Sequence, residues 1–210
     1  MESSIKFFAF FLLSSLLFSE TYPSFTQKEL LDIEKKKGSI SKNRIVDYEK
    51  TLKRVSSFSK YKQLTSINFY LNQLLPQYDD VINKKEDHWA TPKEFLTTGY
   101  GDCEDYVIIK YFSLIKLGFD EKKLFITVVK ETYYGGYHMV LTYFQEENES
   151  PLVLDNLSFK ILNLQTRNDI KADIFINSTG VYKMKDKKLV KFAHNSKKYL
   201  ELLESIKKEK

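Results

Sequence analysis

The sequence predicts an α+β protein in which helices come first, an antiparallel sheet follows and one more helix ends the chain. Two observations indicate this order. Apolar residues recur at helical spacing between residues 26 and 118, and short segments rich in Ile, Val and Thr follow from residue 124 onward. The composition agrees, because 42% of the 210 residues are hydrophobic and 29% are charged. These values are typical of one globular domain and exclude a disordered chain, a collagen and a multi-span membrane protein.

The N-terminus has the pattern of a signal peptide. Lys6 precedes an uncharged run over residues 7–19. This run is shorter than the about 20 apolar residues that a transmembrane helix needs, and it has the length of a signal-peptide hydrophobic region. We therefore predict that residues 1–19 direct export and are then removed, with a retained anchor as the alternative.

The segment after this leader is predicted to be helical. A short helix begins at Thr26, which forms a capping box with Glu29, and it ends at Gly38. Two longer helical patterns follow over residues 45–55 and 61–74.

Another helix is predicted after a polar loop that contains the only tryptophan, Trp89. Thr91 is the expected N-cap, Pro92 is the first helical residue and Glu94 reaches back to the cap. Gly99 ends this helix.

A longer apolar helix is predicted to begin directly after the glycine-rich turn at residues 99–101 and to end at Gly118. Asp102 is its natural N-cap. Cys103 therefore lies in the first turn of a buried helix.

Strands make up most of the remaining chain. They are predicted at residues 124–131, 138–145, 152–155, 173–177 and 180–184, with a turn at residues 133–137.

A basic amphipathic helix is predicted to close the chain. Residues 183–210 hold ten lysines against four acidic residues, whereas the net charge of the whole chain is +5. We interpret this basic segment as a solvated helical face and predict no nucleic-acid partner, because no arginine cluster or aromatic stacking platform accompanies it. The apolar side of the helix carries Tyr199, Leu202, Leu203 and Ile206.

The single cysteine is the main candidate for chemistry. In an exported chain Cys103 has no intramolecular disulfide partner, so it is an inert buried thiol, an intermolecular disulfide or a reactive group. A helix N-terminus favours the thiolate. His138 begins one predicted strand and Asp155 ends the next, so the three side chains can converge if these strands are adjacent. Asp155 as a plain turn residue is the alternative.

Three acidic residues oppose this hypothesis. Asp102, Glu104 and Asp105 lie within one helical turn of the thiol, and their negative charges raise its pKa. A bound hard cation such as Ca²⁺ would reverse the sign of this effect. The alternative is that these acids merely cap the helix N-terminus.

Four sequence blocks resemble the signatures of a known family. They are WATPKEFL at residues 89–96, GDCEDY at 101–106, YHMVL at 137–141 and PLVLDN at 151–156. In order and spacing they are similar to the bacterial transglutaminase-like cysteine proteinases, the LapG-type periplasmic proteases that release biofilm adhesins. The resemblance runs from about residue 67 to residue 183.

This resemblance implies a papain-like, transglutaminase-like core and a site. The family's catalytic residues fall on Cys103, His138 and Asp155, and its calcium-binding acids fall on Asp102, Glu104 and Asp105. Trp89 is expected either to wall the substrate cleft or to pack in the core.

The resemblance also implies partners and a location. The expected substrate is the N-terminal region of a large surface adhesin, cut at a paired-alanine site. The expected regulator is an inner-membrane cyclic di-GMP receptor that sequesters the protease. We therefore expect a calcium-dependent periplasmic enzyme that promotes biofilm dispersal and has no stable membrane insertion once its signal peptide is removed.

The chain is accordingly divided into four segments: a signal peptide at residues 1–19, an N-terminal helical segment at 20–63, a transglutaminase-like catalytic core at 64–190 and a basic C-terminal helix at 191–210. Two other functions stay open at this point. One is an amide acyltransferase of the same fold, in which an amine replaces water, and the other is a non-catalytic binding module.

Overall fold

The computed structural model describes residues 22–76, 88–133, 135–146, 149–186 and 188–209. The predicted signal peptide lies outside these residues. Within them, no helix combines the length and the apolar character needed to cross a membrane.

The helices follow the order that the sequence predicts, and the predicted caps at Thr26, Thr91 and Asp102 are the N-caps of α2, α6 and α7. The helix at Cys103 is almost entirely buried, from Glu104 to Ile115. In the described residues the α-helices are α2 (Gln27–Lys37), α3 (Ser39–Val55), α4 (Lys60–Leu71), α6 (Pro92–Thr98), α7 (Cys103–Lys116) and α8 (Lys197–Lys208), and the 3-10 turns are η1 (Glu121–Lys123) and η2 (Leu164–Thr166).

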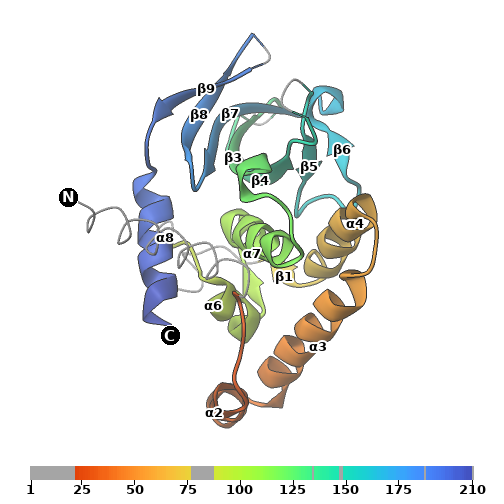
Figure 1. Ribbon diagram of the computed structural model, residues 1–210, viewed down its shortest axis with the longest axis vertical. Coiled ribbons are helices and arrows are strands. Elements are labelled where there is room, and N and C mark those ends of the chain that lie inside the picture. The colour runs from red at the N-terminus through yellow and green to blue at the C-terminus, as the bar shows by residue number, and fades with distance from the viewer. Residues whose placement is uncertain (1–21, 77–87, 134, 147–148, 187, 210) are drawn as a thin grey trace, which may run out of the picture.

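The strands form one antiparallel sheet of seven strands in the order β6-β5-β4-β3-β7-β8-β9 (Figure 1). This confirms the α+β class. The strands are β3 (Leu124–Glu131), β4 (Tyr137–Tyr143), β5 (Leu152–Leu154), β6 (Leu162–Asn163), β7 (Ile170–Asn177), β8 (Gly180–Lys185) and β9 (Lys188–Ala193), and a separate parallel pair is β1 (Leu75–Pro76) with β2 (Tyr100–Gly101).

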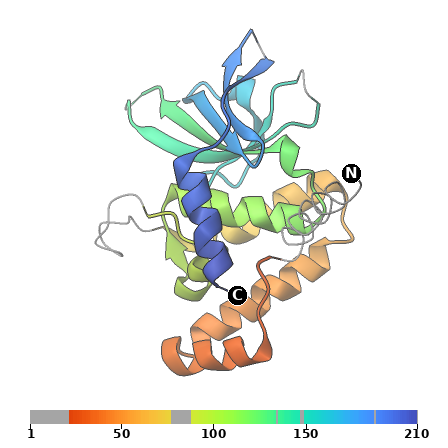
Figure 2. The same ribbon diagram turned by 60° about the vertical axis from the view of Figure 1, so that its left-hand side comes forward.

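Helix α7 is the centre of the molecule. Figure 2 shows the sheet on one side of it and the N-terminal helices on the other, with α8 crossing alongside. One hydrophobic cluster joins α7 to Ile126 of β3, Leu141 of β4 and Leu154 of β5. Burying large apolar side chains stabilises the fold by about 1.5–3 kcal/mol for each one. The packing therefore holds the start of α7 at a fixed place beside the sheet.

The link between α6 and α7 sets the position of Cys103. Thr91 and Glu94 make the predicted capping box, and Gly99 ends α6 with φ at +82°, a left-handed conformation that favours glycine. The side chain of Arg44 donates to the carbonyl oxygens of Leu96 and Thr97 at 2.9 and 3.0 Å. The chain can therefore turn sharply from α6 into α7.

The structure differs from the sequence prediction mainly at the sheet edges. Strand β9 was expected to be part of a basic tail, because its lysines mask the alternating pattern. It lies at one edge of the sheet, where one side faces solvent and lysine is tolerated. Strand β6, at the other edge, has only two residues and is too short for a pattern.

Candidate active site

Cys103 is the first residue of α7, as predicted, and Asp102 is the N-cap. The helix begins here because Asp105 reaches back, its Oδ2 accepting from the backbone N–H of Asp102 at 3.4 Å. The first N–H groups of a helix have no partner within the helix. The thiol therefore lies where backbone donors and the helix dipole favour negative charge.

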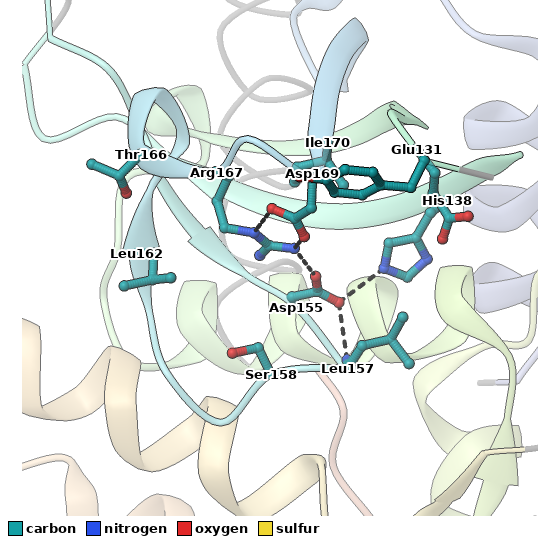
Figure 3. Close-up of a pocket in the computed structure, with 11 residues that line it drawn as sticks. Glu131, His138, Asp155, Leu157, Ser158, Leu162, Thr166, Arg167, Asp169 and Ile170 are labelled. Carbon is teal, nitrogen blue, oxygen red and sulfur yellow. Dashed lines mark hydrogen bonds and ion pairs between the residues drawn. The ribbon is translucent and has the colours of Figure 1, made fainter. Parts of the chain in front are cut away.

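His138 and Asp155 come from adjacent antiparallel strands. His138 is the second residue of β4, and Asp155 directly follows β5, which pairs with β4. His138 Nε2 lies 2.8 Å from Asp155 Oδ1 (Figure 3). Both side chains are buried, with 7% and 1% of their surface exposed. The sequence analysis expected these two side chains to lie close together if their strands were adjacent, and this contact confirms that expectation.

Two further groups hold the Asp155 carboxylate. The backbone N–H of Leu157 donates to Oδ1 at 2.9 Å, and Nη2 of Arg167 donates to Oδ2 at 2.9 Å. Burial by itself raises the pKa of Asp155, but the hydrogen bonds and charges of His138, Leu157 and Arg167 outweigh it and hold that pKa well below its usual range. Asp155 is therefore an anion that accepts from the imidazole.

The thiol of Cys103 has a different environment. Its S–H donates to Glu104 Oε2 at 3.2 Å. Burial raises the pKa of Cys103, the charges of Glu104 and Asp102 raise it further, and a hydrogen bond from the backbone of Met139 lowers it in part. The negative charges that the sequence places around Cys103 therefore do raise the pKa of the thiol in the folded protein, and this environment favours the neutral thiol.

The structure brings His138 and Asp155 into direct contact and places Cys103 against the backbone of Met139, the residue after His138. Among the described residues, no hydrogen bond connects the Cys103 thiol with the imidazole. The thiol and the His138–Asp155 pair therefore occupy neighbouring positions, at the start of α7 and the start of β4.

The three acidic residues around Cys103 are not equivalent. Asp105 is used by the fold, because its Oδ1 accepts from the backbone N–H of Ala90 at 2.7 Å and its Oδ2 accepts from Asp102. Glu104 faces the thiol. Across the described part of the chain, no group of three or more His, Cys, Asp or Glu side chains is arranged to hold a metal ion. The carboxylate oxygens of Asp102 and Glu104 are the hard ligands that Ca²⁺ prefers.

Trp89 lies in the irregular segment before α6, as predicted, and its side chain packs in the hydrophobic core. Its side chain is buried in the cluster that contains α7, and Nε1 has no hydrogen-bond partner among the described residues. The backbone of the neighbouring Ala90 is bound by Asp105. This placement matches the packing alternative for Trp89.

A cavity of about 430 Å³ lies beside the His138–Asp155 pair. It extends from the pair to the segment between η2 and β7, and Figure 3 shows its side chains. Cys103 is not part of its wall. The lining residues are Glu131, Tyr133, His138, Asp155, Leu157, Ser158, Leu162, Thr166, Arg167, Asp169 and Ile170.

Arg167 and Asp169 are the site residues that sequence analysis missed. Arg167 bridges Asp155 and Asp169, and its side chain is 9% exposed. The only signal in the sequence is an Arg-x-Asp pair in an unpatterned segment, and such pairs are common on solvated surfaces.

Comparisons with known proteins support the fold and the family of the chain. No curated protein sequence matches the chain. The calcium-bound structure of Legionella pneumophila LapG is similar with a TM-score of 0.75 and 26% identity, over 87% of this chain and 99% of that one. The EGTA-treated LapG structure gives a TM-score of 0.72 and 28% identity, over 84% of this chain and 97% of that one.

A third structure of Legionella pneumophila LapG gives a TM-score of 0.72 and 26% identity, over 90% of this chain and 98% of that chain. The sequence profile of the family described as bacterial transglutaminase-like cysteine proteinases matches residues 41–169. Because this match spans more than half of the chain, the protein belongs to the bacterial transglutaminase-like cysteine proteinases.

Proposed function

We propose that the protein is a calcium-dependent periplasmic endopeptidase that cleaves the N-terminal region of a large surface adhesin at a paired-alanine site. Cys103, His138 and Asp155 are the proposed catalytic residues. The observation that carries the proposal is the buried 2.8 Å contact between His138 and Asp155 beside a thiol at a helix N-terminus. A cysteine nucleophile needs a base held by a third group, and this pair supplies the base and its partner.

The proposed reaction is acyl transfer to water. The Cys103 sulfur attacks the scissile carbonyl carbon, and His138 takes the thiol proton and passes it to the leaving amine. Water activated by His138 then hydrolyses the thioester and restores the thiol. Asp155 fixes the orientation of the imidazole and stabilises its protonated form. The backbone N–H of Cys103 is the proposed first donor to the oxyanion.

Calcium is proposed to act on the charge around the thiol. Asp102 and Glu104 would hold the ion, because their oxygens are suitable ligands and Asp105 is already bound to the backbone of Ala90. When bound, the ion supplies positive charge that offsets the two carboxylates. Two similar structures are described as calcium-bound and EGTA-treated LapG, which supports calcium as the cation.

The proposed location and regulation come from the family resemblance and from the leader-like N-terminus. Export through residues 1–19 would put the protease and the adhesin's N-terminal region in the same compartment. An inner-membrane cyclic di-GMP receptor would hold the protease when the messenger is abundant. Adhesin release and biofilm dispersal would follow when the messenger falls.

The direct test is cleavage of a purified adhesin N-terminal fragment. We expect two fragments, complete inhibition by EGTA and recovery with added Ca²⁺. Cys103→Ala, His138→Gln and Asp155→Asn should each lose activity and remain folded. His194→Gln is the matched histidine control, because His194 is exposed in the connection before α8 and should leave cleavage unchanged.

The outcomes separate the proposal from its alternatives. Undiminished cleavage by Cys103→Ala would refute the proposed function. Transfer of a labelled primary amine to the adhesin, in place of two unlabelled fragments, would indicate an acyltransferase. Tight adhesin binding without any product would indicate a binding module.

A further inference from the structure

The feature that the proposed mechanism does not use is the pair Arg167 and Asp169 behind Asp155. Both residues lie between η2 and β7, outside the four sequence blocks that resemble the family. The Arg167 side chain is 9% exposed, whereas that of Asp169 is 47% exposed. A buried guanidinium is costly unless charged partners surround it, so its position needs an explanation.

The guanidinium is held in one plane by Asp169. Arg167 Nε donates to Asp169 Oδ1 at 2.7 Å, and Nη2 donates to Asp169 Oδ2 at 2.6 Å. The same Nη2 donates to Asp155 Oδ2 at 2.9 Å (Figure 3). A two-point contact of this kind fixes direction as well as distance. Asp169 therefore fixes the direction of the Nη2 hydrogen that Arg167 donates to Asp155.

The backbone fixes both residues as well. The N–H of Thr132, just after β3, donates to the carbonyl oxygen of Asp169 at 2.8 Å, and the N–H of Arg167 donates to the carbonyl oxygen of Leu164 at 3.1 Å. The guanidinium is thus anchored to the end of β3 and to η2.

We propose that Arg167 is a positioning residue for the His138–Asp155 pair and that Asp169 holds Arg167 in the orientation this requires. The inference rests on the proposed function, because it assigns His138 and Asp155 a catalytic role. Asp155 Oδ1 already accepts from His138 and from the backbone of Leu157. Arg167 occupies Oδ2, so the carboxylate cannot rotate without losing a charged hydrogen bond.

Arg167 also sets the charge that His138 experiences. Asp155 contacts the imidazole, and Glu131, Tyr133, Arg167 and Asp169 line the same cavity. Cys103 and Glu104 lie at the start of α7, and Lys110 of α7 interacts electrostatically with Asp155. In this set Arg167 is the cation in hydrogen-bond contact with Asp155. Its removal would leave more negative charge near the imidazole, whereas removal of the Asp169 charge would leave less.

The test compares charge changes of opposite sign on the full mature chain. Arg167→Met removes the cation, and Asp169→Asn removes the anion with little change of shape. NMR titration of the imidazole protons is practical because the chain has three histidines. Cys103→Ala is used as the parent, so that thiol ionisation does not contribute. His138→Gln identifies the signal of His138.

We expect His138 to take up its proton at higher pH in Arg167→Met than in the parent, and at lower pH in Asp169→Asn. A merely structural role would not produce shifts of opposite sign. With Cys103 restored, Arg167→Met should lower kcat for adhesin cleavage by roughly 10- to 100-fold at unchanged KM, as expected for a lost charged hydrogen bond. Arg167→Lys should restore the titration but only part of kcat, because lysine lacks the planar fork.

Lys171→Met is the matched control. Lys171 is an exposed cation on β7, so its loss should change neither the titration nor kcat. A folded Arg167→Met protein with the parent's titration and wild-type kcat would overturn the inference. If Arg167→Met does not fold, an unchanged titration in Asp169→Asn overturns it instead. The proposed function fails separately, through cleavage by Cys103→Ala.

Discussion

Lys110 is a fully buried lysine in the middle of α7, and its replacement by methionine gives a sharp stability prediction. Its side chain is 0% exposed, and Nζ has no hydrogen-bond partner among the described residues. The ring of Tyr106 has its centre 5.9 Å from Nζ. Burial lowers the pKa of Lys110 from 10.5 to about 7, and the charge of Asp155 opposes this only in part. The lysine is therefore neutral in the folded protein at alkaline pH.

The sign and size of the effect follow from these values. Between about pH 7 and 10.5 the unfolded chain keeps a proton on Lys110 that the folded protein lacks. The free energy of unfolding therefore rises with pH over this range, by up to about 1.4 kcal/mol per pH unit. Methionine has a similar shape and does not titrate. The free energy of unfolding of Lys110→Met should exceed that of the wild type by roughly 3 kcal/mol at pH 8. Between pH 8 and pH 9.5 this difference should decrease by about 2 kcal/mol.

The assay is urea unfolding followed by the fluorescence of Trp89, the only tryptophan, which is buried. Cys103 and several buried tyrosines have raised pKa values, which lowers the stability of both proteins at alkaline pH. The difference between wild type and variant cancels these contributions. Lys53→Met, at an exposed position on α3, is the control and should show no pH-dependent difference.

A stability difference that stays constant from pH 8 to pH 9.5 would refute the reasoning. It would mean that Lys110 keeps its proton inside the folded protein. A Lys110→Met protein less stable than wild type at pH 8 would refute it as well.

Three further predictions concern the elements that position the site, each measured by urea unfolding. Gly101→Ala should cost about 1–3 kcal/mol, because a Cβ at this position would lie 2.5 Å from Asp105 Oδ2 and 3.0 Å from the ring of Phe95; unchanged stability would contradict this. Asp105→Ala should cost about 1–3 kcal/mol, because it leaves the buried N–H of Ala90 without its acceptor; a loss of Ca²⁺ response at full stability would instead indicate a metal ligand. Ile108→Ala should cost about 2–5 kcal/mol, because Ile108 is 0% exposed in the centre of α7; a cost below 1 kcal/mol would mean that the core closes around the deletion.

The sequence by itself determined the local features of the fold. Capping at Thr91 and Asp102 and chain reversal at Gly99 depend on neighbours within a few residues, so they are visible in the sequence. The segment at residues 124–131, predicted from its content of Ile, Val and Thr, likewise matched β3 residue for residue. Edge strand β9 was missed, because an edge position weakens the alternation on which strand prediction depends.

The candidate site was only partly determined in this way. The cap placed Cys103 at a helix start, and the four sequence blocks indicated His138 and Asp155. That these two side chains touch is a consequence of β4 pairing with β5, a contact between residues 17 positions apart that no local pattern specifies.

Only the tertiary structure decided how the charges around the site are used. Asp105 and Glu104 are neighbours in sequence, yet one binds the backbone of Ala90 and the other faces the thiol. Nothing in the sequence distinguishes Arg167 from other loop residues, yet in the folded protein its guanidinium donates to Asp155. The energy of a charge depends on its burial and its partners, and both are set by residues far away in the chain.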